Sequence, residues 1–296
     1  MQTIFITGST GKIGNILLKS LVNEDYQIIV LLRKKQIEHI GNPKIKYIYG
    51  DILKPFSYAA ALKNVDIVLH MAALTHTNKI NMYYEINSAA TAGLIEECKK
   101  NGVKRFIFIS TRAISEKGGH YSRSKLMAER HVQASGLDWV IIRLSEVYGI
   151  DGESGIDMLL NRIEKFPFVP IIGGDKYKLA PVYVADVLSA ISGVIKESGI
   201  KNRIYNIAGP ESLTFREIID KVLKAKNIKK IKLRIPIFAV QACAHILSLF
   251  SDNNFMVTDQ LPRFLSEKSG DISLAVNELG FNPVTLDKYL AGYGKN

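Results

Sequence analysis

Tyr121 and Lys125, four residues apart, are well suited to moving a proton. They open a segment of helical period, residues 121–135, so both side chains lie on one face of a helix, one turn apart. A tyrosine normally ionises at a pH of about 10, too high for a useful base, but a nearby ammonium group stabilises the phenolate and lowers its pKa. The spacing predicts an acid–base pair, and a solvated helical turn is the alternative.

Three glycines follow the first apolar run of the chain, between an expected strand and an expected helix. Gly8 permits a tight turn, Gly11 lets the backbone approach a pyrophosphate, and Gly14 lets the helix pack closely on the strand. The helix N-terminus then offers free N–H groups to the phosphates. We expect a dinucleotide to bind at Gly8, Ser9, Thr10, Gly11, Lys12, Ile13 and Gly14. A glycine-rich turn without a ligand is the alternative.

The residues after the second expected strand bear on the choice of cofactor. An acidic residue there would bind the ribose hydroxyls of NAD, whereas an arginine accommodates the extra phosphate of NADP. The chain has Arg33, Lys34 and Lys35 at this place, and no acidic residue before Glu38. Because a guanidinium can bind a phosphate through two hydrogen bonds, the sequence favours NADP, with NAD as the alternative cofactor. Solvated basic residues on a loop are the other interpretation.

The elements that must position these residues follow a regular alternation. Short runs rich in Ile, Val and Phe recur between longer segments of helical period, including residues 82–100, which is typical of βαβ units. Right-handed crossovers then give an α/β fold with one Rossmann-like, doubly wound parallel sheet. Strands are expected at residues 3–7, 27–32, 45–49, 67–71, 105–110 and 140–144.

The alternation loosens after Gly149, where prolines and glycines interrupt it. A short strand at 203–208 and a helix at 215–226 are expected there. We predict a cofactor-binding Rossmann domain over residues 1–150, with returning segments from about 180–210. Residues 151–296 would form mainly a smaller mixed α/β lobe that binds substrate.

The composition excludes several other classes of protein. A net charge of +11 favours anionic partners, but the basic run at 224–234 lacks the interleaved aromatic residues of nucleic-acid platforms. The apolar segment 235–250 is too short to cross a bilayer and predicts a buried amphipathic helix, with a helix on a membrane surface as the alternative. Cys98 and Cys243 have neither metal-site nor disulfide-framework spacing, so we expect reduced thiols and no metal. The start lacks the pattern of a signal peptide, which predicts a cytoplasmic protein.

Several motifs in order resemble the extended short-chain dehydrogenases, the NAD(P)-dependent nucleotide-sugar epimerase and dehydratase family. The G-x-x-G-x-x-G turn is one of them, although it differs from the G-x-G-x-x-G of the Rossmann fingerprint. The resemblance covers nearly the whole chain. The other motifs are Gly50-Asp51-Ile52, His70-Met71-Ala72-Ala73, Asn87, Tyr121-Ser-Arg-Ser-Lys125, Arg143-Leu-Ser-Glu-Val-Tyr-Gly149, Pro181-Val-Tyr-Val-Ala-Asp186 and Tyr205-Asn-Ile-Ala-Gly209.

The resemblance implies roles for individual residues. Thr111, Tyr121 and Lys125 would form the Ser/Thr–Tyr–Lys catalytic triad, with Tyr121 and Lys125 also contacting the cofactor. Asp51 would bind the adenine and Ile52 would pack on it, although Asp51 could instead cap a turn. Ala72 and Ala73 would line the dinucleotide, or serve simple helix–sheet packing.

The resemblance also implies a substrate, a nucleotide-activated sugar that is epimerised or reduced, and leaves a homodimer open. Dehydratases of the family carry an Asp-Glu pair after the catalytic threonine, but Arg112 and Ala113 stand here, so dehydration is not expected. Arg112 would contact an anionic substrate or form a salt bridge. Lys176 and Lys178 would reach the substrate's phosphates, or stay solvated. Nine residues separate Thr111 from Tyr121, a short loop that should leave the substrate cleft more open.

Two other functions remain open from the sequence. Relatives of this fold serve as cofactor-sensing regulators or assembly factors, but an intact triad favours an enzyme. Reductases of apolar alcohols such as sterols use the same scaffold, and the net positive charge of this chain argues against such a substrate.

Overall fold

The computed structural model describes residues 1–33, 40–150, 155–165, 167–172, 177–240, 242 and 271–292. The chain divides into two compact units. The first consists of Met1–Glu116, His120–Arg143 and Ile191–Tyr205, and the second of Lys117–Gly119, Leu144–Ala190 and Asn206–Asn296.

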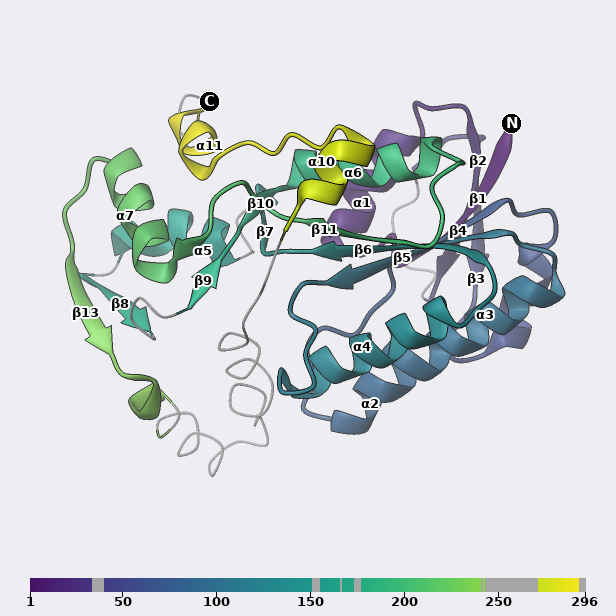
Figure 1. Cartoon of the computed structure of the whole chain (residues 1–296), viewed down its shortest axis with the longest axis horizontal. Coiled ribbons are helices and arrows are strands. Elements are labelled where there is room, and N and C mark those ends of the chain that lie inside the picture. The colour runs from purple at the N-terminus through teal and green to yellow at the C-terminus, as the bar shows by residue number, and fades with distance from the viewer. Residues whose placement is uncertain are drawn as a thin grey trace. The chain divides into compact units, whose positions relative to one another are not determined.

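The first unit is built on a seven-stranded sheet in the order β11-β6-β5-β4-β1-β2-β3 (Figure 1). The pairs β1–β2, β1–β4, β2–β3 and β4–β5 are parallel. The predicted doubly wound, Rossmann-like sheet is confirmed. Its strands are β1 (Gln2–Thr7), β2 (Tyr26–Leu32), β3 (Ile45–Tyr49), β4 (Ile67–His70), β5 (Arg105–Thr111), β6 (Asp138–Leu144) and β11 (Arg203–Ile207).

Helices cover both faces of this sheet, which explains why the central strands are near-continuous apolar runs. The helices α2, α3 and α4 lie on one face, and α1 lies on the other with α6, whose last six residues belong to this unit (Figure 1). The helices are α1 (Lys12–Leu21), α2 (Ile80–Tyr84), α3 (Ala90–Lys100), α4 (Gly119–Gln133) and α6 (Val184–Lys196), with short 3-10 turns η1 (Pro55–Ser57) and η2 (Ala59–Leu62).

The segment predicted as one helix over 82–100 is interrupted. A π-helical turn, η3 (Glu85–Ala89), separates α2 from α3. Such turns occur often at functional sites because the extra residue redirects a side chain. Here the turn carries Asn87, whose side chain is buried and hydrogen-bonded outside its own helix.

The core on the α3–α4 face of the sheet fixes where these helices lie. Phe106 and Phe108 of β5 pack in one buried cluster with Leu94 of α3 and with Ala128 and Val132 of α4. Burying side chains of this size contributes roughly 1.5–3 kcal/mol each. Because α4 also carries Tyr121 and Lys125, this packing holds the expected acid–base pair against β5.

The second unit has a mixed α/β composition. Three two-stranded sheets form it, β10–β7 and β13–β8, which are parallel, and β12–β9, which is antiparallel. Its other elements are β7 (Val147–Tyr148), α5 (Gly155–Arg162), η4 (Ile163–Lys165), β8 (Phe168–Ile172), β9 (Lys178–Leu179), β10 (Val182–Tyr183), β12 (Leu213–Thr214), α7 (Phe215–Ala225), β13 (Ile231–Ile235), α10 (Ser273–Leu279) and α11 (Leu286–Gly292).

A capping box starts α7 at the predicted place. The Thr214 hydroxyl accepts from the Glu217 amide, and the Glu217 carboxylate accepts from the Thr214 amide. The apolar face of α7 then packs with α5 and α11 in the core of this unit. Of the segment 235–250, predicted as a buried amphipathic helix, residues 237–240 and 242 are helical, Ile235 belongs to β13, and residues 241 and 243–250 lie outside the described residues. Phe238 is exposed, so burial is not found at this position.

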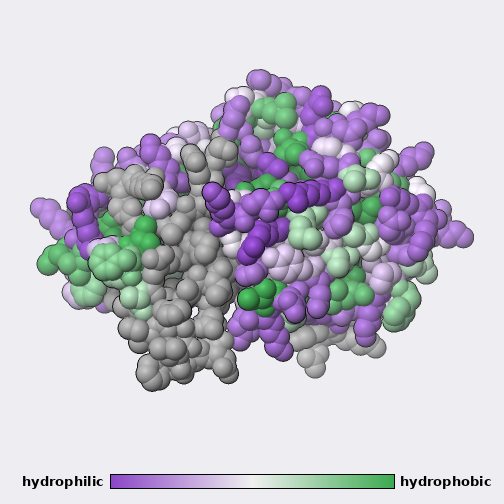
Figure 2. All heavy atoms as spheres, turned by 60° about the horizontal axis from the view of Figure 1, so that its bottom comes forward, coloured by the Kyte–Doolittle hydropathy of each residue, from purple (hydrophilic) through white to green (hydrophobic). Residues whose placement is uncertain are grey.

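The face of the molecule drawn in Figure 2 is mainly polar where its residues are described. Hydrophilic side chains cover much of the face drawn in Figure 2, with small hydrophobic areas between them. Within the described part of the chain, no helix is both long and apolar enough to span a membrane. Cys98 is a buried free thiol, and Cys243 lies outside the described residues.

Candidate active site

The glycine turn joins β1 to α1 through positions that tolerate no side chain. Gly8 has φ +78°, and a Cβ there would come within 2.4 Å of the Ala72 amide nitrogen. A Cβ on Gly14 would lie 2.3 Å from the Gly8 carbonyl oxygen. Gly11 is the N-cap of α1 and supplies no side-chain cap, so the first-turn amides remain suited to bind an anion. Ser9 is buried, whereas Thr10 and Lys12 are exposed and Ile13 is half-buried.

The turn lies where the strand order reverses between β1 and β4. Thr7 is paired in register with His70, so the carboxyl ends of β1 and β4 meet at this edge of the sheet. The Ala72 amide donates to Thr7 Oγ1 at 3.2 Å. Ala72 and Ala73 therefore follow β4 beside the glycine turn, at the switch point where open α/β sheets bind ligands.

His70 connects three elements beneath this edge and was not among the predicted site residues. Its Nδ1 lies 2.6 Å from Thr7 Oγ1, and its Nε2 lies 2.9 Å from Thr91 Oγ1 of α3. Burial, with a smaller contribution from the charge of Lys125, lowers the pKa of His70 to about 3. The ring is therefore neutral at physiological pH and holds the strand ends as a hydrogen-bonding spacer.

The residues expected around the adenosine end of the cofactor follow β2 and β3. Arg33 is exposed directly after β2, whereas Lys34 and Lys35 lie outside the described residues. Asp51 Oδ1 accepts from the Leu53 amide at 3.0 Å, so this carboxylate stabilises a local turn. Ile52 is partly buried against the core. The adenine contact of Asp51 stays a prediction.

The predicted catalytic side chains come from β5 and α4 of the first unit. Thr111 is half-buried at the end of β5, and its Oγ1 accepts from the Ala113 amide at 3.1 Å. Tyr121 is 5% exposed and meets the Tyr83 ring edge-on, with centroids 6.1 Å apart. A rigid aromatic contact of this kind fixes the direction of the phenol.

Lys125 is buried on the same face of α4, one turn after Tyr121. Its Nζ donates to the Ile109 carbonyl at 2.8 Å and lies 3.8 Å from the centre of the Phe108 ring. Burial lowers the pKa of Lys125 to about 7, and the negative charge of Glu129 opposes that shift. An ammonium group so placed can change its protonation state near neutral pH.

Asn87 braces the segment after β4 against α4. Its Oδ1 accepts from the Leu74 amide, while its Nδ2 donates to the Leu74 carbonyl and to Ser124 Oγ. Ser124 in turn donates to the Tyr121 carbonyl at 2.8 Å. Asn87 stood in the motifs quoted above, but no role was predicted for it, because these contacts depend on the π-helical turn.

The short loop after Thr111 is fastened to the start of α4. Ser122 Oγ donates to the Ala113 carbonyl and accepts from the Ser115 amide at 2.8 Å. Arg112 is 6% exposed, whereas a solvated salt bridge would leave it at the surface. Of the two lysines expected to contact substrate, Lys178 is exposed on β9 of the second unit, and Lys176 lies outside the described residues.

The geometry fits a dinucleotide. The glycine turn is a cradle that added Cβ atoms at Gly8 and Gly14 would fill, and it opens at a helix N-terminus on the switch point of the sheet. No group of three or more His, Cys, Asp or Glu side chains that could hold a metal occurs among the described residues. With the Thr–Tyr–Lys set on β5 and α4, this fold and site define the extended short-chain dehydrogenase class.

The chain belongs to the NAD dependent epimerase/dehydratase family, whose sequence profile matches residues 4–208. It is 25% identical to a UDP-glucose 4-epimerase of Vibrio cholerae, covering 95% of this chain and 91% of the relative. It is 26% identical to a decarboxylating sterol-4-alpha-carboxylate 3-dehydrogenase of Dictyostelium discoideum, covering 79% of this chain and 80% of the relative. The crystal structure of the Bacillus cereus UDP-glucuronic acid 4-epimerase in complex with UDP-glucuronic acid and NAD shares this fold, with a TM-score of 0.76, 22% identity, and coverage of 98% and 96%.

Proposed function

We propose that this protein is an NAD(P)-dependent 4-epimerase or 4-ketoreductase of a nucleotide-activated sugar. The observation that carries the proposal is the pair Tyr121 and Lys125, buried one turn apart on α4 in the same unit as the glycine turn. Burying a phenol and an ammonium group has a cost that apolar side chains avoid. A catalytic use explains why both are retained there.

The residues of the chain divide the proton chemistry among themselves. The Tyr121 phenol gives a proton to a carbonyl oxygen in reduction and takes one from a hydroxyl group in oxidation. The Lys125 ammonium stabilises the phenolate form, and the Thr111 hydroxyl donates a hydrogen bond to the reacting oxygen. A bound nicotinamide would supply or accept the hydride. Gly8, Gly11 and Gly14 would hold its pyrophosphate.

For the cofactor we propose NADP in preference to NAD. Arg33, exposed at the end of β2, is suited to the 2′-phosphate through charge-assisted hydrogen bonds. NAD remains the alternative cofactor, because the Bacillus cereus epimerase of the same fold was crystallised with NAD.

The sugar-nucleotide substrate is supported by the Vibrio cholerae relative, which is a UDP-glucose 4-epimerase. Arg112 and Ala113 stand where dehydratases of the family carry an acid pair, so removal of water is not part of the proposal. We assign Lys176 and Lys178 to the substrate's phosphates and Arg112 to an anionic group on it.

A sterol-type alcohol is the second candidate substrate, because the Dictyostelium relative is a sterol-4-alpha-carboxylate 3-dehydrogenase. A cofactor-sensing protein without catalysis is a third reading, and the complete Thr111, Tyr121 and Lys125 set argues against it.

The test has a binding arm and a turnover arm. NADP should raise the melting temperature, and UDP or dTDP sugars should raise it further, since a ligand of the folded state stabilises that state. Tyr121→Phe should keep both shifts but lower turnover by about 10²- to 10⁴-fold, because it deletes the proton donor and keeps the ring. Tyr47→Phe, which removes a hydroxyl from β3, is the matched control.

Stabilisation by sterols, with none from a broad panel of nucleotide sugars, would select the second candidate. Full turnover by Tyr121→Phe would refute the proposed mechanism.

A further inference from the structure

Glu129 is a buried carboxylate in the first unit that the proton chemistry above does not use. It is 1% exposed. Arg143 of β6 binds it with two groups, Nε to Oε1 at 3.0 Å and Nη2 to Oε2 at 2.6 Å. Ser110 Oγ of β5 donates to Oε1 at 2.5 Å. These contacts hold the carboxylate group at one place, since charge-assisted and bidentate hydrogen bonds are the strong ones.

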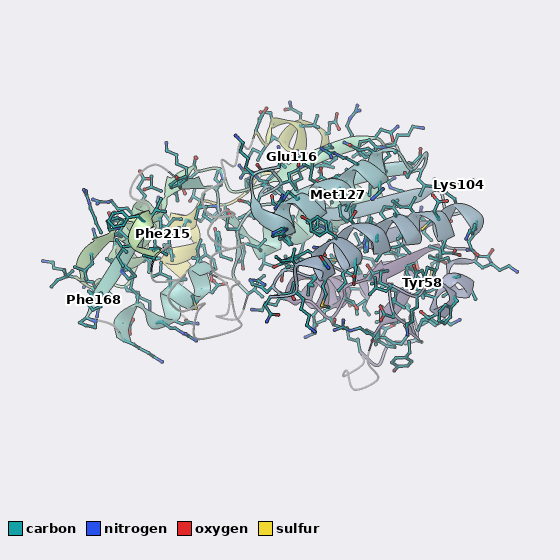
Figure 3. All side chains as sticks on the ribbon, turned by 90° about the horizontal axis from the view of Figure 1, so that it is seen from below. Tyr58, Lys104, Glu116, Met127, Phe168 and Phe215 are labelled. Carbon is teal, nitrogen blue, oxygen red and sulfur yellow. The ribbon has the colours of Figure 1, made fainter. Side chains whose placement is uncertain are left out.

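Glu129 continues the face of α4 that carries the catalytic pair. Tyr121, Lys125 and Glu129 follow one another at intervals of four residues, so each lies one helical turn beyond the last. All three are at most 5% exposed. Met127, on the outer face of the same helix, is 40% exposed (Figure 3).

Most groups around Lys125 do not stabilise its positive charge by an opposite charge, and Glu129 is the group that does. Burial lowers the pKa of Lys125, and the charge of Glu129 raises it. From β5, Lys125 meets a carbonyl oxygen and the Phe108 ring, which are uncharged. The imidazole of His70 on β4 is neutral, and Arg143 on β6 adds a positive charge that Glu129 already binds. Glu129 is therefore the negative charge that this face of α4 presents to Lys125.

We propose that Glu129, held by Arg143 and Ser110, is a positioning residue that increases the protonated fraction of Lys125 for its action on Tyr121. This inference rests on the proposed function, because it assigns Glu129 a part in the same proton chemistry. Without the carboxylate, a smaller fraction of Lys125 carries its positive charge at physiological pH. A neutral amine does not stabilise the Tyr121 phenolate by charge.

A purely structural ion pair predicts a different outcome. If Glu129 served only to pair with Arg143, its removal would destabilise the fold, because it leaves a buried charge unpaired. The protonation of Lys125 would then stay as it is. Stability alone does not separate these two roles, whereas the titration of Lys125 does.

The experiment uses the full-length protein labelled with ¹³C at lysine Cε, titrated by NMR without ligand. The Lys125 resonance is assigned as the one missing from Lys125→Met. In Glu129→Gln we expect the acid dissociation constant of Lys125 to rise about tenfold, a pKa one unit lower. The matched control is Glu116→Gln, which removes the exposed partner of Arg130 on the same helix (Figure 3) and should leave Lys125 unchanged.

A second variant covers the case in which Glu129→Gln does not fold. Glu129→Gln with Arg143→Met replaces the pair by uncharged side chains of similar volume, a change that is often tolerated. It should also lower the pKa of Lys125, but by less than the single variant does, because the positive charge of Arg143 is removed together with the carboxylate. An unchanged Lys125 titration in whichever of the two variants folds would overturn the proposal.

The measurement does not depend on the reaction. Loss of cofactor binding or an active Tyr121→Phe would refute the proposed function without changing the Lys125 titration. A shifted titration together with a changed pH profile of turnover in Glu129→Gln supports both.

Discussion

Lys125 shows how burial and charge oppose each other at a single residue. The residue is 2% exposed, and a carbonyl oxygen, an aromatic ring and a carboxylate one turn away compensate its ammonium group in part. The lowered pKa of Lys125 shows that these contacts offset only part of the cost of burying its charge. The site therefore holds a group whose charge is costly for folding and useful for acid–base chemistry.

The first prediction is that Lys125→Met stabilises the unliganded protein at neutral pH. The pKa of Lys125 falls from 10.5 to about 7 on folding. Between these values the unfolded chain binds more protons, so the wild type gains stability as the pH rises from about 7 to 10.5. The advantage of Lys125→Met should be largest below pH 7 and should shrink toward pH 10.5.

Urea unfolding of both proteins across this pH range measures the difference. An advantage that grows with pH would contradict the assignment. Lys104→Met, outside the site, serves as the control for the loss of a lysine.

The second prediction concerns Arg33 and the choice of cofactor. A charge-assisted contact to the 2′-phosphate contributes about 1.5–3 kcal/mol, so the wild type should bind NADPH roughly 10- to 100-fold more tightly than NADH. Arg33→Asp should reverse the order, because its carboxylate repels the phosphate and accepts from the ribose hydroxyls. Fluorescence titration of both cofactors decides it, with the exposed Lys19→Asp as control. Equal affinities in the wild type would remove the NADP assignment.

At the level of elements, the glycine turn shows how a strand, a turn and a helix form one rigid unit. The first turn of α1 packs against the backbone of the turn that precedes it, and β4 approaches the same turn from the other side. The position of the helix N-terminus therefore depends on Gly14 as much as on Gly8. A shift of α1 would move the amides that a pyrophosphate needs.

The third prediction is that Gly14→Ala destabilises the protein by about 1–3 kcal/mol and weakens cofactor binding. The added Cβ would meet backbone atoms of Gly8 and Ser9 at 2.3 and 2.9 Å, and backbone does not yield as a flexible side chain does. Gly193→Ala, in the middle of α6 with nothing within 4 Å of its Cβ, is the matched control. It should stabilise by about 1 kcal/mol through helix propensity. Chemical denaturation compares the two, and equal effects would refute the packing argument.

At the level of the whole molecule, the stability of the first unit depends on a histidine that links its strand ends to a helix. His70 is fully buried between β1, α3 and the Phe108 ring. Such a group makes folding sensitive to acid, because below pH 6.5 this histidine takes up a proton in the unfolded chain but stays neutral in the native chain until the pH nears 3.

The fourth prediction follows from this difference. The pKa of His70 falls from 6.5 to about 3 on folding, so its contribution to stability is complete above pH 6.5 and is lost as the pH falls toward 3. His70→Gln should be less stable than the wild type at pH 7.5, and the gap should narrow toward pH 4. The exposed His76→Gln controls for loss of a histidine. A gap that stays constant in urea unfolding at both pH values would show that His70 titrates normally.

The sequence by itself determined the strands and the doubly wound class of the sheet, because the patterns that predict them are local, whereas the strand order came from the structure. Apolar runs between helical segments specify βαβ units, and the single allowed handedness of their crossovers leaves few topologies. The glycine turn and the Tyr121–Lys125 spacing were equally visible, since backbone conformation and one helical turn span only a few residues. The third member of that spacing, Glu129, could have been noticed on the same face.

Only the tertiary structure decided what surrounds these residues. The contacts of His70 with Thr7 and Thr91, of Asn87 with Leu74, and of Glu129 with Arg143 join residues 13 to 63 positions apart. Pairings across such distances depend on strand register and on the π-helical turn, and no short-range pattern encodes either. Burial also sets the protonation of Lys125 and His70, and burial exists only once β5 and α4 have packed together.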